Sequence, residues 1–189
     1  MSAQDSKLFV ISGPSGAGKG TLVTRVRERR SNLGLTVSAT TRAPRKGEVD
    51  GVNYFFLTRE EFDRRVANGE FVEWAEVHGN CYGTLVSEVQ SKLASGSSLI
   101  LEIDVQGALQ VKERFPEAVL IFILPPSLEV LRERLVGRGT ETPETIELRM
   151  ANAADELALA DRYDDVVVND DLDRATDELV RVLDMHERI

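Results

Sequence analysis

The sequence predicts an α/β protein with a doubly wound parallel sheet, and three observations lead to that prediction. Short apolar runs typical of buried parallel strands recur along the chain, at residues 8–12, 99–103, 119–124 and 166–168. Segments with helical periodicity separate these runs, at about residues 108–115, 128–136, 143–161 and 173–188. The first strand leads through a glycine-rich loop into a helix at residues 21–30, which is the opening of an α/β unit. We therefore expect parallel strands joined by right-handed crossovers.

The composition indicates one soluble globular domain. The chain has 189 residues, of which 42% are hydrophobic and 29% charged, enough to bury a sizeable core. Its 23 Lys and Arg against 32 Asp and Glu give a net charge of −9, which disfavours nucleic acid or an anionic membrane as a partner. Arginine outnumbers lysine 18 to 5, and arginine is the side chain that binds phosphate with two parallel hydrogen bonds. We expect this positive charge to be gathered at a few places.

The cysteine content and the amino terminus predict a cytoplasmic protein. With a single cysteine, Cys81, no intrachain disulfide is possible. The amino-terminal residues lack the apolar core of a signal peptide. The longest apolar run, residues 118–124, is far shorter than a membrane span, so we expect no membrane partner.

The glycine-rich loop matches a phosphate-binding motif. Residues 13–19, Gly13-Pro14-Ser15-Gly16-Ala17-Gly18-Lys19, fit the pattern G-x-x-x-x-G-K that follows a strand and opens a helix. Glycines let the backbone turn its N–H groups around an anion, and the lysine reaches the outer phosphates of a nucleotide. The hydroxyl that normally follows the lysine is displaced, because Gly20 stands there and Thr21 comes next. A glycine-rich turn without a ligand is the alternative, and the flanking strand and helix argue against it.

Residues 36 to about 90 depart from the alternating pattern and predict a small mixed α+β insert. Residues 54–57 and 71–77 have the composition of short strands. Thr58 and Glu61 form a capping box that begins a helix, which continues to about Asn68 and stops at Gly69.

Two features of this insert suggest a phosphorylated purine as the ligand. Arg42 and Arg45 flank Ala43-Pro44, a spacing that suits a phosphate dianion, although a solvated basic loop has the same pattern. Glu73 has apolar neighbours, and a carboxylate held there needs hydrogen-bond donors. Guanine offers N1–H and N2–H₂ as donors, and Ser38 or Thr84 would supply a hydroxyl to its O6. The alternative for Glu73 is an exposed strand residue.

Five stretches together resemble the guanylate kinase family. They are GPSGAGKGT at 13–21, VSATTRAPRKGEVDGVNYFF at 37–56, GEFVEWAEVHGNCYGT at 69–84, LEIDVQG at 101–107 and GRGTET at 137–142. The resemblance runs from about residue 8 to residue 188, and the block at 38–84 is specific to that family. It implies a P-loop fold in which residues 1–189 form a single domain. The domain would comprise a core (7–35, 91–125 and 160–189), a GMP-binding insert (36–90) and a helical lid (about 126–159).

The resemblance also implies roles for individual residues. The residues expected to read guanine are Ser38, Glu73 and Thr84. Those expected to hold the GMP phosphate are Arg42, Arg45, Tyr54 and Tyr82, with Glu102 and Asp104 as an acidic pair near GMP and the metal. The catalytic cations would be Lys19 and the lid arginines Arg134, Arg138 and Arg149. ATP is expected to bind the loop from Gly13 to Thr21, together with Asn169.

The reaction that the resemblance implies is ATP-dependent phosphorylation of GMP, and also of dGMP, to the diphosphate, without a general base. We expect the Mg²⁺ cofactor to be held mainly by nucleotide phosphates and water, with Thr21 or Asp104 as the candidate protein ligand. The alternatives are a non-catalytic guanylate-kinase-like binding module and a kinase for another nucleoside monophosphate. The intact phosphate loop argues against the first, and Glu73 argues against the second. The sequence leaves open whether the protein is a monomer or a homo-oligomer.

Overall fold

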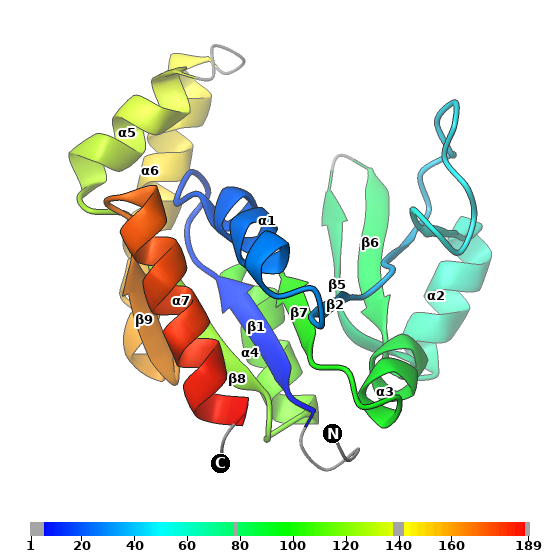
Figure 1. The fold of residues 1–189 in the computed structure, drawn as a ribbon. Coiled ribbons are helices and arrows are strands. Elements are labelled where there is room, and N and C mark those ends of the chain that lie inside the picture. Colours follow the sequence, from blue (N-terminus) through cyan, green and yellow to red (C-terminus); the bar gives the residue numbers. More distant parts are fainter. Residues whose placement is uncertain (1–5, 78, 138–141, 188–189) are drawn as a thin grey trace.

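A five-stranded parallel sheet forms the centre of the molecule (Figure 1). The computed structural model describes residues 6–77, 79–137 and 142–187. The strand order is β2 (Gly34–Leu35), β7 (Leu99–Glu102), β1 (Leu8–Ser12), β8 (Val119–Leu124) and β9 (Asp165–Val168). In β1, Val10 lies opposite Leu101 on one side and Leu120 on the other. The parallel sheet predicted from the apolar runs is therefore confirmed.

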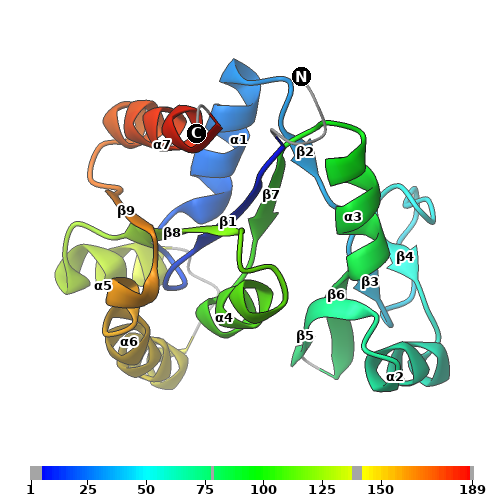
Figure 2. The ribbon, with the colours of Figure 1, turned by 90° about the horizontal axis from the view of Figure 1, so that it is seen from below.

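Helices cover both faces of this sheet because successive side chains of a strand point to opposite faces (Figure 2). Phe9 and Ile11 of β1 belong to a core cluster with α1 (Lys19–Arg29) and α7 (Leu172–Glu187). Val10, between them, belongs to a second cluster with α3 (Val86–Ala94) and α4 (Val105–Arg114). This two-sided burial explains why the strands are continuous apolar runs rather than alternating ones.

A second, four-stranded sheet lies beside the first, as a mixed α+β unit. Its order is β4 (Phe55–Phe56), β3 (Ala39–Thr40), β6 (Asn80–Leu85) and β5 (Phe71–Val77), and α2 (Arg59–Ala67) packs on it. The small core between α2 and the sheet consists of Ala39, Phe62, Phe71, Cys81 and Leu85.

The sequence patterns identified β5, α2 and approximately β4, but they missed β6. Gly83 in the middle of β6 is a weak strand former, yet a Cβ there would lie 2.7 Å from the Glu73 carbonyl oxygen. Close packing of β5 against β6 therefore requires glycine at position 83, and that glycine weakens the sequence pattern that would indicate a strand. The helix α3 that follows β6 was also missed.

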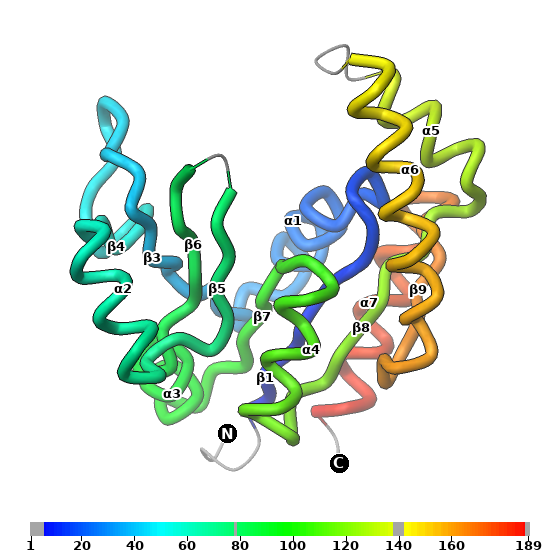
Figure 3. Tube along the Cα trace, turned by 180° about the vertical axis from the view of Figure 1, so that it is seen from behind, coloured from blue at the N-terminus to red at the C-terminus, as the bar shows by residue number. Residues whose placement is uncertain are grey.

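Two helices, α5 (Leu128–Gly137) and α6 (Pro143–Leu157), project from the core on the side opposite the second sheet (Figures 1 and 3). The helix expected over 143–161 ends at Leu157, and a 3₁₀ turn follows at Ala160–Arg162. Leu131 and Leu135 of α5 and Ala153 of α6 are buried against one another. Across the described ranges, no helix is long and apolar enough to span a bilayer.

The capping box predicted before α2 is half confirmed, and it gives a stability test. Thr58 Oγ1 accepts a hydrogen bond from the Glu61 backbone N–H at 3.1 Å, while the Glu61 carboxylate accepts from Arg65 Nε at 2.7 Å. Thr58→Ala should lower the free energy of unfolding by about 1 kcal/mol, because one helix N–H loses its acceptor. Thr58→Ser should restore it, as measured by denaturant unfolding. Equal stability of the alanine and serine variants would contradict this role for the cap.

Candidate active site

The phosphate-loop motif forms a concave turn between β1 and α1. Gly13, Gly16 and Gly18 have φ values of 140°, 94° and 90°, which side-chain-bearing residues rarely adopt. Lys19 begins α1, and its Nζ donates to the carbonyl oxygens of Gly13 at 2.6 Å and Pro14 at 3.1 Å. The ammonium group thus lies at the rim of a 320 Å³ pocket, next to the positive end of a helix. This arrangement suits a polyphosphate.

Asn169, at the end of β9, supports this loop from the side. Its Nδ2 donates to the Ala17 backbone carbonyl oxygen at 2.7 Å, and the Asn169 backbone carbonyl oxygen accepts from Arg134 Nη2 at 3.0 Å. A Cβ on Gly18 would lie 2.4 Å from that Nδ2 atom, so the third glycine of the motif leaves room for Asn169. Arg134 and Asn169 also line a 500 Å³ pocket beside the loop. The Asn169 side chain therefore supports the phosphate loop, and the nucleotide-binding role expected of it stays a prediction.

Glu102, the last residue of β7, lies next to the loop at Gly20. A Cβ on Gly20 would be 3.3 Å from Glu102 Oε1, so the carboxylate stands close to where a serine side chain would project. Burial raises the pKa of Glu102, and the positive charge of Lys19 opposes that shift. Carboxylate oxygens are ligands that Mg²⁺ prefers, so Glu102 and Thr21 fit a metal held mainly by phosphates. Within residues 6–77, 79–137 and 142–187, no three His, Cys, Asp or Glu side chains group closely enough to hold a metal.

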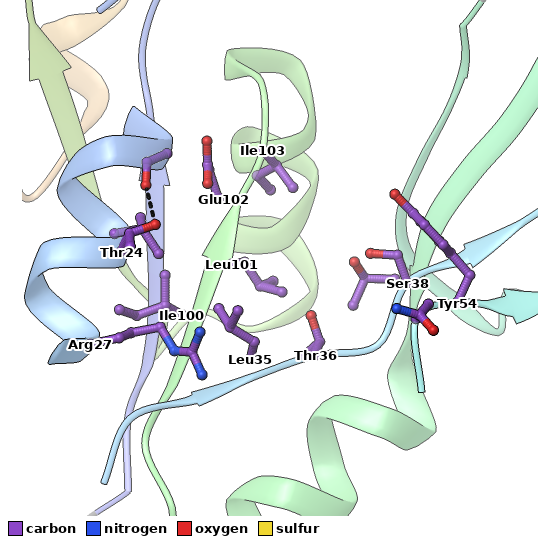
Figure 4. Close-up of a pocket in the computed structure, with 14 residues that line it drawn as sticks. Thr24, Arg27, Leu35, Thr36, Ser38, Tyr54, Ile100, Leu101, Glu102 and Ile103 are labelled. Carbon is purple, nitrogen blue, oxygen red and sulfur yellow. Dashed lines mark hydrogen bonds between the residues drawn. The ribbon is translucent and has the colours of Figure 1, made fainter. Parts of the chain in front are cut away.

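A second pocket, of 380 Å³, lies between the core and the second sheet (Figure 4). Glu102 enters it from β7, Thr24 and Arg27 line it from α1, and Ser38 and Tyr54 line it from the opposite side. Glu102 lines this pocket and the pocket of the phosphate loop as well. The two pockets therefore meet at one carboxylate.

Glu73 points from β5 toward the amino-terminal end of α4. A bulge in β5 shifts its pairing with β6, so that Glu73 lies opposite Thr84. Thr84 Oγ1 donates to Glu73 Oε1 at 2.8 Å, and a Cβ on Gly107 would be 3.5 Å from Glu73 Oε2. Burial raises the pKa of Glu73, the negative charge of Asp104 raises it further, and the Thr84 hydrogen bond opposes both. Glu73 is thus a largely buried acceptor, not the exposed strand residue that was its alternative.

Asp104 has a structural task beside Glu73. It caps α4, because its Oδ1 accepts from the Gly107 backbone N–H at 2.7 Å. A Cβ on Gly107 would lie 3.4 Å from that oxygen and 3.5 Å from Glu73 Oε2, so the carboxylates of Asp104 and Glu73 are neighbours.

Arg42 is held by Glu48, a residue that the sequence reasoning did not single out. Arg42 Nη2 donates to Glu48 Oε1 at 2.9 Å, and its guanidinium lies 5.4 Å from the centre of the Tyr54 ring. Glu48 also accepts from the Arg45 backbone N–H at 2.6 Å. Hydrogen bonds from Arg42 and then from Arg45 lower the pKa of Glu48. The sequence signal for Glu48 is a carboxylate three residues after Arg45. At that spacing Glu48 can bond both the Arg42 side chain and the Arg45 backbone.

The remaining predicted residues divide into three groups. Tyr82 lies beside Tyr54, with 6.2 Å between the ring centres, and the Arg45 side chain is exposed nearby. Arg149 of α6 reaches the phosphate loop, where its Nη1 donates to Ser15 Oγ at 2.7 Å. Arg138 lies outside the described residues. The projecting helices therefore supply two arginines, Arg134 and Arg149, to the surroundings of the loop.

Known proteins match the chain over nearly its whole length. The family model described as guanylate kinase matches residues 5–186. The guanylate kinase of Gloeobacter violaceus is 57% identical over 178 residues, covering 94% of this chain and 87% of the relative. That of Halalkalibacterium halodurans is 52% identical over 183 residues, covering 97% and 90%.

A solved structure agrees with these sequence matches. The crystal structure of guanylate kinase from Anaplasma phagocytophilum superposes with a TM-score of 0.72 at 37% identity, covering 96% of this chain and 86% of that one. In this chain the pocket of the phosphate loop and the pocket beside the second sheet meet at Glu102. The sequence matches and the shared fold show that the chain belongs to the guanylate kinase family.

Proposed function

We propose that the phosphate loop and the pocket of the second sheet hold ATP and GMP for direct transfer of the γ-phosphoryl group, the reaction of the guanylate kinase family. The observation that carries this assignment is that both pockets are lined by Glu102. Residues 36–90 then form the GMP-binding insert and α5–α6 the lid. In-line transfer needs the acceptor oxygen next to the γ-phosphate, so adjoining pockets are the main requirement.

GMP recognition would rest on Glu73 and its neighbours. An ionised Glu73 can accept two hydrogen bonds from N1–H and N2–H₂ of guanine. Adenine has an unprotonated N1 at the corresponding position, which would repel a carboxylate. The Thr84 hydroxyl, now 2.8 Å from Glu73, and that of Ser38 are the candidate donors to O6. Leaving a buried carboxylate unmatched is costly, so this pocket would reject adenine strongly.

The GMP phosphate would lie against Arg42, Arg45, Tyr54 and Tyr82. Arg42 is already oriented by Glu48, so little side-chain entropy is lost when a phosphate binds. A phosphate monoester has a second pKa of about 6 and is mostly a dianion at neutral pH. It can therefore attack without a general base.

ATP would bind with its β- and γ-phosphates on the loop and Lys19. Bound Mg²⁺ would neutralise phosphate oxygens, with Thr21 and Glu102, which line the pocket of the loop, as candidate protein ligands. Arg149 already contacts Ser15 of the loop, and Arg134 lies beside Asn169. These two arginines would stabilise the charge that spreads over the transferring group, and the α5–α6 pair would exclude water.

Removing the loop lysine tests the ATP side. Lys19→Ala should lower kcat about 10²- to 10³-fold, because a charge that stabilises the transition state is lost. Production of GDP would be followed in a coupled assay, and thermal unfolding would show that the fold persists. Lys46→Ala removes an equal charge from an exposed position and should leave kcat unchanged. Near-normal turnover by the Lys19 variant would refute the assigned role.

The raised pKa of Glu73 predicts how GMP binding depends on pH. Only the ionised carboxylate accepts both guanine donors, so affinity is full above the pKa of Glu73 and falls as pH drops through it. Because that pKa lies above the ordinary value, the loss should begin at a higher pH than for an exposed glutamate. Titration calorimetry between pH 8 and pH 5 would measure it.

The matched variant for this experiment is Glu73→Gln, which does not titrate. It should bind GMP about 10- to 100-fold more weakly at pH 8, with ATP binding unchanged. The GMP phosphate titrates equally with both proteins, so the ratio of their dissociation constants isolates Glu73. A ratio that stays constant over the whole pH range would contradict the base-pocket assignment.

Glu48 should act on GMP through Arg42. Glu48→Gln removes the charge that orients the guanidinium, and we expect KM for GMP to rise about five- to tenfold, with KM for ATP unchanged. Glu60→Gln, on the exposed face of α2, removes the same charge away from the site. Steady-state kinetics with each nucleotide varied in turn would check this. An equal effect of the two substitutions would show that Glu48 acts only through net charge.

A further inference from the structure

The strand β3 ends where the loop that carries Arg42 begins. It consists of Ala39 and Thr40, and it pairs antiparallel with β6 so that Thr40 lies opposite Tyr82 (Figure 3). Residues directly opposite each other in an antiparallel pair share one face of the sheet. Ala39, on the other face, belongs to the small core between α2 and the sheet. Thr40 therefore lies on the same face as Tyr82, a residue expected at the GMP phosphate.

The Thr40 hydroxyl joins the start of that loop to β6. Its Oγ1 donates to the Cys81 backbone carbonyl oxygen at 2.9 Å and accepts from the Arg42 backbone N–H at 3.2 Å. Thr40 is 0% exposed, so its hydroxyl serves these two backbone groups and is closed off from solvent. The hydroxyl thus connects the backbone of Arg42 to the residue that precedes Tyr82.

The Thr41 hydroxyl makes a second connection to Cys81. Its Oγ1 accepts from the Cys81 backbone N–H at 2.8 Å, and the Thr41 backbone N–H donates to the Cys81 carbonyl oxygen at 3.0 Å. Both backbone polar groups of Cys81 are therefore bonded to Thr40 and Thr41, which immediately precede Arg42. Backbone groups inside a protein need partners, and here side-chain hydroxyls supply them beyond the last residue of β3.

Arg42 and Tyr82 lie in one cluster with Tyr54. The Arg42 guanidinium is 5.4 Å from the centre of the Tyr54 ring, and the centres of the Tyr54 and Tyr82 rings are 6.2 Å apart. Glu48 accepts from Arg42 Nη2 at 2.9 Å. Glu48 thus holds the far end of the Arg42 side chain, whereas the threonine hydroxyls hold its backbone. Donors from two different segments bind one phosphate well only when their separation is set in advance.

We propose that Thr40 and Thr41 are positioning residues for the GMP phosphate, because their hydroxyls set the separation between Arg42 and Tyr82. Thr40 acts through the backbone N–H of Arg42, and Thr41 acts through the backbone N–H of Cys81, next to Tyr82. This inference rests on the proposed assignment of Arg42 and Tyr82 to the GMP phosphate. Because the base would be read from β5 by Glu73, the effect of the two hydroxyls should be confined to the phosphate.

The test removes a hydroxyl while keeping the size of the side chain. Thr40→Val leaves the Arg42 N–H without its acceptor and should weaken GMP binding about five- to tenfold. Binding of guanosine, which has the base but no phosphate, should be unchanged. Titration calorimetry with each ligand gives the ratio of the two dissociation constants. Thr40→Ser keeps the hydroxyl and should retain the wild-type ratio.

Thr41 provides a second variant, at a half-buried position that tolerates substitution better. Thr41→Val removes the acceptor of the Cys81 N–H and should weaken GMP binding about two- to fivefold, again without an effect on guanosine. If Thr40→Val does not fold, this variant decides between the outcomes, and equal GMP binding by Thr41→Val and the wild type would then overturn the proposal.

A matched control separates positioning from loss of stability. Thr58→Ala weakens the cap of α2 in the same α+β unit, away from Arg42, and should leave the ratio of dissociation constants unchanged. Wild-type GMP binding by Thr40→Val, equal losses for GMP and guanosine, or a serine variant that behaves like the valine variant would each overturn the proposal. Arg42→Ala should itself reduce the preference for GMP over guanosine. If it did not, the proposed phosphate site would fail first, so the two failures are distinguishable.

Discussion

The close packing of the phosphate loop against three neighbouring elements constrains the rest of the site. A Cβ on Gly13 would lie 2.4 Å from the Ile123 carbonyl oxygen of β8, and one on Gly16 would lie 2.9 Å from Leu131 of α5. One on Gly18 would meet Asn169 after β9. The loop can take this shape only where β1 lies next to β8, with β9 one strand further, which is the observed strand order. The phosphate loop, the strand order and the α5 helix are therefore packed together as one arrangement.

The acidic composition is compatible with anionic substrates because neighbouring protein groups order the cations in the site. Many arginines on the outside form exposed ion pairs, such as Arg59 with Asp63, and these contribute little to stability. In the site, Glu48 holds Arg42, and the charge of Lys19 acts on Glu102. A partner carboxylate fixes the geometry of a cation but also weakens its attraction for phosphate. The arrangement favours positioning over raw affinity, which is what phosphoryl transfer requires.

The sequence predicted the parts of the fold whose local pattern agrees with the tertiary environment. Strands buried on both faces and the glycine-rich loop are such parts, because burial and backbone shape leave a direct trace in residue type. Strand β6 has no such pattern, because the close approach of Glu73 and Trp74 on the neighbouring strand requires glycine at position 83. Glu48 was missed for a related reason, and so was the support that Asn169 gives to the phosphate loop. Both residues form hydrogen bonds to other protein groups. Sequence motifs indicate the residues that contact a ligand, but they rarely indicate the residues that hold those ligand-binding residues in place.

Asp104, at the start of α4, and Glu73, in the neighbouring strand β5, show how the same chemical group performs different tasks in adjoining positions. Asp104 uses one oxygen to cap the helix, where the backbone N–H of Gly107 stabilises its charge. Glu73 accepts from Thr84 and is half-buried, and burial is the main cause that raises its pKa, so further donors from a ligand would stabilise its charge. Asp104 raises that pKa further, because like charges oppose ionisation of a neighbour. Thr84 satisfies part of the hydrogen-bonding capacity of Glu73, and the two donors of guanine would satisfy more of it. Specificity for guanine would then arise from the same burial that raises the pKa of Glu73, because that burial makes further donors valuable.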